Sequence, residues 1–294
     1  MRSALLLAAL LAGPATEQDP VPSEEPEELE DDLAYADHVL ALPDGALEYE
    51  TVAGTLVLRE EDGDARASVF HVAYLEAGLG EDAEALAARP VTFCFNGGPG
   101  SSSVWLHLGA FGPRRVDLGE DGFRLAPPFR LVDNPHGLLD LTDLVFVDPV
   151  TTGYSRAAEG VDDKDFHGVD ADVESVGEFV RLWLTRNGRW TSPIYLAGES
   201  YGTTRAAKLA RHLQERHGIY PSGAVLVSSI LQFGTARFDT GNDLPYVLFL
   251  PTYAATAWYH GRLDAELQAL PVADLAARAR AFALGPYAAA LLRG

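Results

Sequence analysis

A serine flanked by glycines is the residue best suited to covalent chemistry in this sequence: Gly198-Glu199-Ser200-Tyr201-Gly202. An apolar run precedes it, and an alanine-rich, helix-prone segment follows it. In a strained turn from a strand to a helix, such a serine exposes its hydroxyl, and larger flanking residues would collide with neighbouring backbone. The helix N-terminus directs backbone N–H groups at a developing oxyanion. We therefore predict that Ser200 is a nucleophile; the alternative is an ordinary strand–helix turn.

A glycine-rich loop, Phe95–Ser103 (FNGGPGSSS), follows another apolar run, Val91–Phe95. A nucleophilic serine turn needs a second backbone N–H donor, which comes from the loop after an earlier strand. The loop lacks the lysine of a phosphate-binding loop, and its glycine spacing does not match a dinucleotide fingerprint. We expect this loop to lie beside Ser200; the alternative is a bare turn.

Both motifs follow apolar runs that have the pattern of buried strands. Four such runs are short, continuous and rich in β-forming residues, as in a parallel sheet covered by helices: Val91–Asn96, Asp143–Asp148, Pro193–Gly198 and Ala224–Ile230. Residues at helical spacing predict helices over Asp170–Asn187 and Tyr201–His217. Alternating residues on both sides of Glu61–Asp64 (EDGD) predict an antiparallel hairpin. Together they predict an α/β fold with a mostly parallel sheet and an N-terminal antiparallel hairpin.

The N-terminus has the layout of a secretory signal peptide over residues 1–15, with Arg2, a short apolar run and small residues near Ala15. The run is too short to cross a bilayer. We expect export, by secretion or into a periplasm, and no membrane span. The next segment is rich in acids and prolines and contains neither lysine nor arginine, so residues 16–45 are predicted to be a disordered acidic linker.

Charge and cysteine content exclude several classes of partner. The formal net charge is −21 at pH 7, which argues against nucleic acid and anionic membranes as partners. Cys94 is the sole cysteine of the sequence, so an internal disulfide and a cysteine-based metal site are excluded.

Four segments, in this order, resemble the serine carboxypeptidase family (peptidase family S10), a group of α/β-hydrolases: NGGPGSSS, GAFGPRRV, DLVFVDPVTTGYSR and PIYLAGESYGTTRAAKLA. The resemblance spans about Ala46–Leu263. It implies an α/β-hydrolase-like fold and removal of C-terminal residues from peptides with a free C-terminus, usually at acidic pH, without a metal or another cofactor. By position, Ser200 resembles the family's nucleophile, and Gly98 and Tyr201 resemble the backbone donors of its oxyanion hole.

Asn96 and Glu199 resemble the pair that holds the substrate's terminal carboxylate in that family. Arginine or lysine would be the usual reader of a carboxylate. A glutamate can face a carboxylate only if one of the two carries a proton, because like charges at hydrogen-bond distance cannot both ionise. We therefore expect an acidic optimum of kcat/KM; an exposed turn residue is the alternative interpretation of Glu199.

Two residues depart from the family's pattern. Cys94 stands where many members have tryptophan, and Thr151 stands where the family usually has glycine. We expect Cys94 to be a buried small hydrophobe, and we interpret Thr151 as a change in a loop that borders the substrate pocket. Asp148 is interpreted as a turn residue, and Ser101–Ser103 as loop hydrogen-bonding residues.

The family's acid and base would follow Ser200, each at the end of a later strand. His212 and His217 lie in the same predicted helix, ~18–25 Å away at ~1.5 Å rise per residue. His260 follows an aromatic-rich stretch with no strand before it, and its recruitment as a base is a minor alternative. We therefore expect the triad's acid and base to lie beyond residue 294.

The predicted organisation places the N-terminal part of an α/β-hydrolase domain at residues 46–240 and the start of a helical cap insertion, C-terminally truncated, at residues 241–294. Such a chain would be a carboxypeptidase fragment that is inactive by itself. Two alternatives stay open: an acyltransferase or esterase on the same scaffold, and a non-catalytic binding protein. The sequence does not indicate an oligomeric state.

Overall fold

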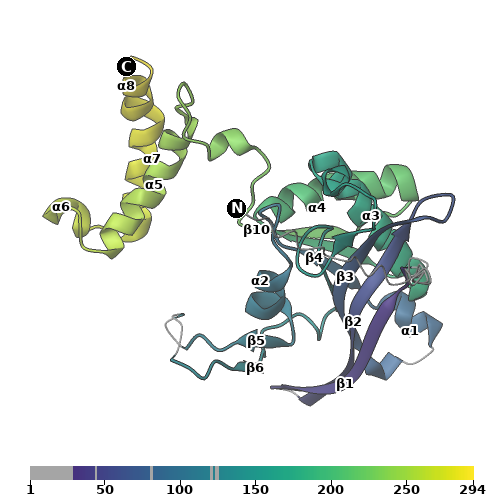
Figure 1. Ribbon diagram of the computed structural model, residues 1–294. Coiled ribbons are helices and arrows are strands. Elements are labelled where there is room, and N and C mark those ends of the chain that lie inside the picture. Colours follow the sequence, from purple (N-terminus) through teal and green to yellow (C-terminus); the bar gives the residue numbers. More distant parts are fainter. Residues whose placement is uncertain (1–28, 44, 80–81, 120–121, 123–125) are drawn as a thin grey trace, which may run out of the picture.

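The computed structural model describes residues 29–43, 45–79, 82–119, 122 and 126–294 (Figure 1). The predicted signal peptide and the first part of the predicted linker lie outside these residues. Eight strands form one sheet in the order β1-β2-β3-β7-β4-β9-β10, with β8 paired to β3. A separate two-stranded ribbon joins β5 to β6.

The first three strands are antiparallel: β1 spans Asp32–Leu42, β2 spans Gly45–Arg59 and β3 spans Ala65–Glu76. The predicted hairpin is β2–β3, and it is confirmed. Strand β1 lies in the segment expected to be disordered, so that prediction is wrong for its residues. Gly54 lets β1 approach β2, because a Cβ there would meet Asp32 O at 1.9 Å. Most β1 side chains are exposed, so the backbone ladder to β2 holds the strand, which composition does not reveal.

The next four strands are parallel to one another: β7 (Asp143–Val147), β4 (Val91–Phe95), β9 (Ile194–Glu199) and β10 (Gly223–Val227). β4 and β7 are buried throughout, as predicted. In β10, Val225 and Leu226 are exposed, which corrects the expectation of a strand buried on both faces. The reason is position: β10 is last in the order, with a neighbouring strand on one side within the described part of the chain.

Helices and short strands complete the fold. The α-helices are α1 (Ala83–Ala88), α2 (Val104–Leu106), α3 (Val169–Arg186), α4 (Tyr201–His212), α5 (Leu244–Tyr259), α6 (Ala265–Gln268), α7 (Val272–Phe282) and α8 (Ala288–Leu291). The short strands are β5 (Arg114–Val116), β6 (Leu131–Asp133) and β8 (Arg156–Ala157). Short 3-10 and π-helical turns are η1 (Ala77–Leu79), η2 (His107–Phe111), η3 (Asp163–Phe166), η4 (Leu213–His217), η5 (Phe233–Thr235) and η6 (Ala283–Tyr287). The helices predicted between the strands are α3 and α4 with η4, and they are confirmed.

The helices α3 and α4 lie side by side on one face of the sheet (Figure 1). Phe93 and Phe95 of β4 point into the apolar core beneath them, together with Trp183 of α3. Cys94 points into a second core on the opposite face, with Leu106 of α2, because successive side chains of a strand alternate between faces. The two cores cover both faces of β4, and the loops at its carboxyl end carry the candidate site.

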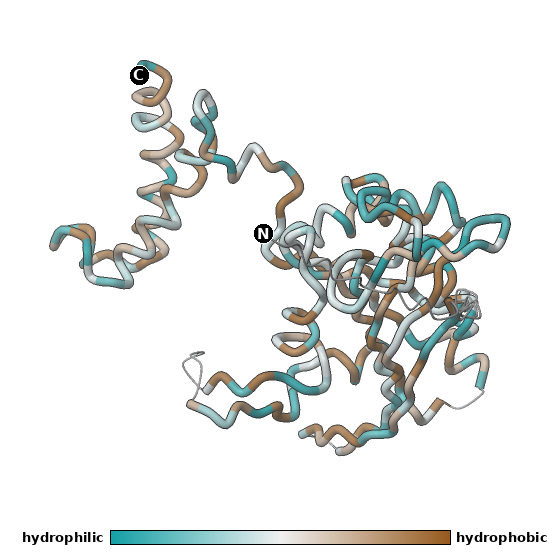
Figure 2. Tube along the Cα trace, viewed as in Figure 1, coloured by the Kyte–Doolittle hydropathy of each residue, from teal (hydrophilic) through white to brown (hydrophobic). Residues whose placement is uncertain are grey.

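The helices α5–α8 stand apart from the sheet, beyond the segment that follows β10 (Figure 1). α5 and α7 pack against each other, and Figure 2 shows apolar residues along both. Large apolar side chains such as Tyr253 and Phe282 are exposed there. Helices were predicted in this region and are confirmed, whereas a cap insertion stays a prediction. In the part of the chain that the structure describes, no helix has the length and apolar character needed to cross a membrane.

Candidate active site

Ser200 occupies a strained turn between β9 and α4. Its backbone has φ 56° and ψ −124°, in the positive-φ region that residues other than glycine rarely adopt. A Cβ at Gly198 would come within 2.1 Å of Gly202 O, and a Cβ at Gly202 would come within 2.5 Å of Phe95 O. Both flanking glycines are therefore required by the backbone, and the predicted turn geometry is confirmed.

The glycine loop after β4 lies directly against this turn. A Cβ at Gly97 would approach the backbone nitrogen of Tyr201 to 2.5 Å and the Ser200 Cβ to 2.9 Å. The prediction that the loop lies beside Ser200 is thus confirmed. The backbone N–H groups of Gly98 and Tyr201 belong to the two segments that meet here, and their role as oxyanion donors stays a prediction.

Asn96 and Glu199 meet at the carboxyl ends of neighbouring strands, β4 and β9. The Asn96 Nδ2 donates a hydrogen bond to Glu199 Oε2 at 3.0 Å, and Asn96 is fully buried. The backbone N–H of Leu106 donates to Asn96 Oδ1 at 3.0 Å. Because a backbone N–H can only donate, this contact fixes the orientation of the amide and aims its nitrogen at Glu199. The structure therefore brings together two of the residues that the sequence proposed for one site.

Asp148 and Ser103 connect the loops that follow β7 and β4. The Ser103 N–H donates to Asp148 Oδ1 at 2.8 Å, and the Ser103 hydroxyl contacts the carbonyl oxygens of Val147 and Cys94. Burial raises the pKa of the Asp148 carboxyl, although the hydrogen bond from Ser103 acts against it. The interpretation of Ser103 as a loop hydrogen-bonding residue is confirmed, and Asp148 directly follows the last residue of β7. Cys94 is fully buried, as predicted, and burial raises the pKa of its thiol.

All eight histidines lie in the described part of the chain, and none forms a hydrogen bond with Ser200 there. His212 contacts Gly177 of α3, and its ring lies 5.4 Å from that of His217. His260 follows the last residue of α5, in the helices that stand apart from the sheet (Figure 1). In the described residues, the structure therefore supplies Ser200 with no histidine base.

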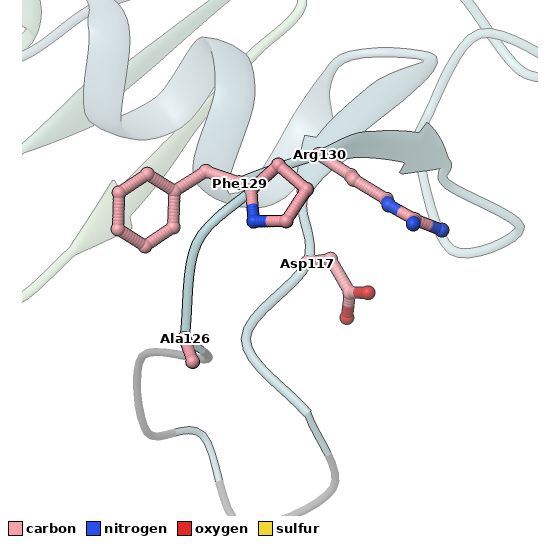
Figure 3. A pocket seen from close by; sticks show the side chains of 5 residues that line it. Asp117, Ala126, Phe129 and Arg130 are labelled. Carbon is pink, nitrogen blue, oxygen red and sulfur yellow. The ribbon is translucent and has the colours of Figure 1, made fainter.

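A cavity of about 510 Å³ lies beside the serine turn. The residues that line it include Gly98, Tyr201, Thr151 and Phe166. A smaller cavity of about 220 Å³, shown in Figure 3, lies between the segments that connect β5 to β6, and its lining contains no residue of the candidate site. Contact with both proposed oxyanion donors makes the larger cavity the candidate substrate pocket.

Thr151 adopts φ 71° in the wall of that pocket, which explains why glycine suits this position. A β-branched residue is strained there, and its hydroxyl contacts His167 Nε2 at 3.2 Å. We expect Thr151→Gly to raise the free energy of unfolding by about 1 kcal/mol, since relief of strain outweighs the greater freedom of glycine in the unfolded chain. Urea denaturation measures the change.

Thr152→Gly is the matched control for this prediction. Thr152 is buried, has no positive φ, and donates a hydrogen bond from its hydroxyl to Pro149 O at 2.8 Å. Its replacement should therefore lower stability by about 1–2 kcal/mol. Equal destabilisation by both substitutions would show that the Thr151 backbone is not under strain.

The sequence profile described as serine carboxypeptidase matches residues 70–224, more than half of the chain. The chain belongs to the serine carboxypeptidase family. The matched residues run from β3 to β10, so they include the serine turn and the glycine loop. The strand order, with four parallel strands next to an antiparallel N-terminal part, confirms the α/β-hydrolase-like fold class.

Relatives of this serine carboxypeptidase family member are considerably longer than the region they share with it. Serine carboxypeptidase-like 37 of Arabidopsis thaliana is 30% identical over 134 residues, which are 44% of this chain and 26% of that protein. The pheromone-processing carboxypeptidase KEX1 of Saccharomyces cerevisiae is 32% identical over 158 residues, 51% of this chain and 20% of that protein. The chain therefore spans about a quarter or less of these relatives' length. Among solved structures, the peroxisomal α/β-hydrolase Lpx1 of Saccharomyces cerevisiae aligns with a TM-score of 0.36 and 11% identity, over 78% of this chain and 57% of that one.

The sequence analysis did not predict two residues of the candidate site of this serine carboxypeptidase family member, Asp172 and Arg205. Both line the candidate pocket and both are buried. The available signal was a charged residue on an otherwise buried helical stripe, since Tyr201, Arg205 and Leu209 follow one another at four-residue spacing on α4.

Proposed function

We propose that this protein is a serine-type carboxypeptidase, which releases C-terminal residues from peptides through an acyl-enzyme formed on Ser200. The observation that carries the proposal is the Asn96–Glu199 pair, which lies beside the strained serine turn. A buried amide donor next to a carboxyl group suits a ligand that itself ends in a carboxyl group. The chain's family supports the same activity.

In the proposed reaction, the Ser200 hydroxyl oxygen attacks the carbonyl carbon of the last peptide bond while a base removes its proton. The N–H groups of Gly98 and Tyr201 donate hydrogen bonds to the oxyanion that forms. The proton then passes to the leaving amine, the C–N bond breaks, and water hydrolyses the acyl-enzyme. Because no histidine hydrogen-bonds to Ser200 in the described residues, we propose that the base and the acid come from a part of the protein outside residues 1–294.

The proposed setting depends on the same residues. The partner is a peptide with a free C-terminus, and the segment at residues 1–15 is proposed to export the protein. Glu199 must share a proton with the substrate's carboxylate, so the site is proposed to work in acidic surroundings.

A second candidate is a non-catalytic protein that binds peptide C-termini. The observation that favours it is again the lack of a histidine contact to Ser200 among the described residues. Both candidates require the Asn96–Glu199 pair, so peptide binding tests the site for either of them. Peptide hydrolysis that Ser200→Ala abolishes would identify the enzyme and exclude the non-catalytic binding protein. We expect residues 1–294 to bind an N-blocked dipeptide but not to hydrolyse it.

Binding of an N-benzyloxycarbonyl dipeptide to the full chain, measured by calorimetry, tests the carboxylate site. The free acid should bind at least tenfold more tightly than the matching C-terminal amide at pH 5. Its affinity should fall by about tenfold per pH unit once both carboxyl groups ionise, because the shared proton is lost. Glu199→Gln should remove this pH dependence while the peptide still binds.

The control is Glu159→Gln, which changes an exposed glutamate outside the pocket and should leave the profile unchanged. Equal affinities for the acid and the amide would contradict the proposed carboxylate site. A Glu199→Gln profile that matched the parent's would contradict the shared proton.

A further inference from the structure

A buried ion pair joins α3 to α4 directly behind the candidate site. Arg205 of α4 is 0% exposed and Asp172 of α3 is 7% exposed. The Arg205 Nε donates to both oxygens of the Asp172 carboxylate at 2.9 Å. A buried pair of this kind gains little net stability over apolar residues of similar size, because both charges lose their hydration. Its presence in two apolar helical faces therefore favours a role other than stability.

The remaining contacts of Arg205 reach both segments that meet at Ser200. Its Nη1 donates to the backbone carbonyl of Asn96 at 2.8 Å. Its guanidinium lies 5.2 Å from the centroid of the Tyr201 ring and 6.0 Å from that of Phe95. Burial raises the pKa of Tyr201 to about 12, and a hydrogen bond to Asp172 acts in the same direction. One ion pair thus holds the residue after Ser200 and the residue before Gly97.

We propose that Arg205, oriented by Asp172, is a positioning residue of the carboxypeptidase site. Arg205 fixes the position of the Asn96 carbonyl. It thereby fixes the peptide group between Asn96 and Gly97 beside Tyr201 of the serine turn. The Asn96 side chain is fixed separately by Leu106, so the amide nitrogen reaches Glu199 only while the Asn96 backbone stays in place. This inference rests on the proposed function, since it assigns Arg205 the task of aligning the residues that would bind the peptide's carboxylate.

Arg205 does not read the substrate's carboxylate itself, although it lines the pocket. Its charge is already neutralised by Asp172, and a second nitrogen, Nη1, donates to a backbone carbonyl. A planar guanidinium suits this arrangement, because its fork of donors can serve a carboxylate and a carbonyl at fixed angles. A lysine has one charged nitrogen and could not hold both partners in these places.

The test uses a double variant of the full chain, Asp172→Leu with Arg205→Met, which removes both charges and leaves neither buried without its partner. We expect its denaturation midpoint to stay near that of the parent. We expect its affinity for the N-blocked dipeptide acid to fall at least tenfold, and its preference for the acid over the amide to shrink. Arg205→Lys should keep the charge but recover only part of the affinity.

The matched control is the double variant Glu178→Leu with Arg181→Met, which removes a partly exposed ion pair on the same helix α3. It should bind the acid as the parent does. Full affinity in the Asp172/Arg205 double variant would overturn the positioning role.

A crystal structure of the Asp172/Arg205 double variant separates this inference from the proposed function. Displacement of Asn96 from Glu199, or of Gly97 from Tyr201, is the expected result. If the Asn96–Glu199 and Gly97–Tyr201 contacts were both unchanged in the double variant, the positioning role would be overturned, whatever peptide the parent binds. Equal affinity of the parent for the acid and the amide would instead count against the proposed function, and the crystal structure would still decide the role of Arg205.

Discussion

Replacing Asp143 with alanine should lower the free energy of unfolding by about 3–5 kcal/mol, the usual cost of leaving buried charges without their partner. Asp143 is the first residue of β7 and is 1% exposed. Its Oδ1 accepts hydrogen bonds from Arg89 Nε at 2.7 Å and from the Glu76 N–H at 3.0 Å. Its Oδ2 pairs with Arg189, which is 3% exposed. One carboxylate therefore pairs with two guanidinium groups and accepts a hydrogen bond from one backbone N–H, while Arg89 also pairs with Glu76 at 2.6 Å.

The loss should be large because these partners come from distant parts of the chain. Arg89 follows α1, Arg189 precedes β9, and the Arg189 Nη2 also donates to Arg89 O at 2.9 Å. The cluster lies at the amino end of the parallel strands, opposite the serine turn. A domain of ordinary stability has about 5–15 kcal/mol in total, so the variant would keep only a fraction of it.

Urea denaturation followed by circular dichroism measures this effect. Asp140→Ala is the control, because Asp140 is an exposed acid three residues earlier, and its change should stay within about 0.5 kcal/mol. If both variants unfolded at the same urea concentration, the buried cluster would not be a centre of stability.

Acidification from pH 6.5 to pH 4 should destabilise the protein by up to about 3 kcal/mol for each of two histidines, His71 and His107. Burial lowers the pKa of each from 6.5 to about 4. A histidine with a lowered pKa in the folded state binds protons more readily when the chain is unfolded. Its contribution to stability is therefore present above pH 6.5 and is lost as the pH falls through that interval.

The surroundings of the two rings explain why they stay neutral. His71 is 1% exposed, packs against the Phe179 ring, and has no hydrogen-bond partner for its Nδ1 within the described residues. His107 stacks on Phe146 at 4.5 Å between centroids, and its Nε2 lies 2.6 Å from the Tyr74 hydroxyl. Among the residues that the structure describes, neither ring has a carboxylate in hydrogen-bond contact that would stabilise a positive charge.

Measurements of unfolding free energy at pH 7, 6, 5 and 4 test this prediction. His71→Gln should remove about half of the pH dependence, whereas His136→Gln, which changes an exposed ring, should leave it intact. A flat profile for the parent would contradict it. As the pH falls, the proposed site gains affinity for the peptide's carboxyl group, while the fold loses stability. Peptide binding should therefore be strongest at a pH low enough for the shared proton and high enough for both histidines to stay neutral.

Local pattern predicted the parts of this protein that depend on neighbours in sequence. The glycines around Ser200 predicted the strained turn, and the apolar runs predicted the strands β4, β7 and β9. The resemblance of Asn96 and Glu199 to a known pair predicted a contact between residues 103 positions apart, and the structure places them 3.0 Å from each other. Their catalytic and binding roles stay predictions.

Other features were decided by tertiary structure, because they depend on partners far along the chain. Strand β1 is held by its backbone ladder to β2, although the acidic, proline-rich residues before it led us to expect disorder there. The exposure of β10 follows from its place at the end of the strand order. The Asp172–Arg205 pair arises where two helices converge behind Ser200; the spacing on α4 indicates a buried charge, but its partner on α3 is identified only by the structure. The sequence by itself determined which residues could carry the chemistry. The packing of α3 and α4 on the sheet decided which residues hold them in place, because a side-chain pair between two helices produces no periodic pattern in the sequence of either helix.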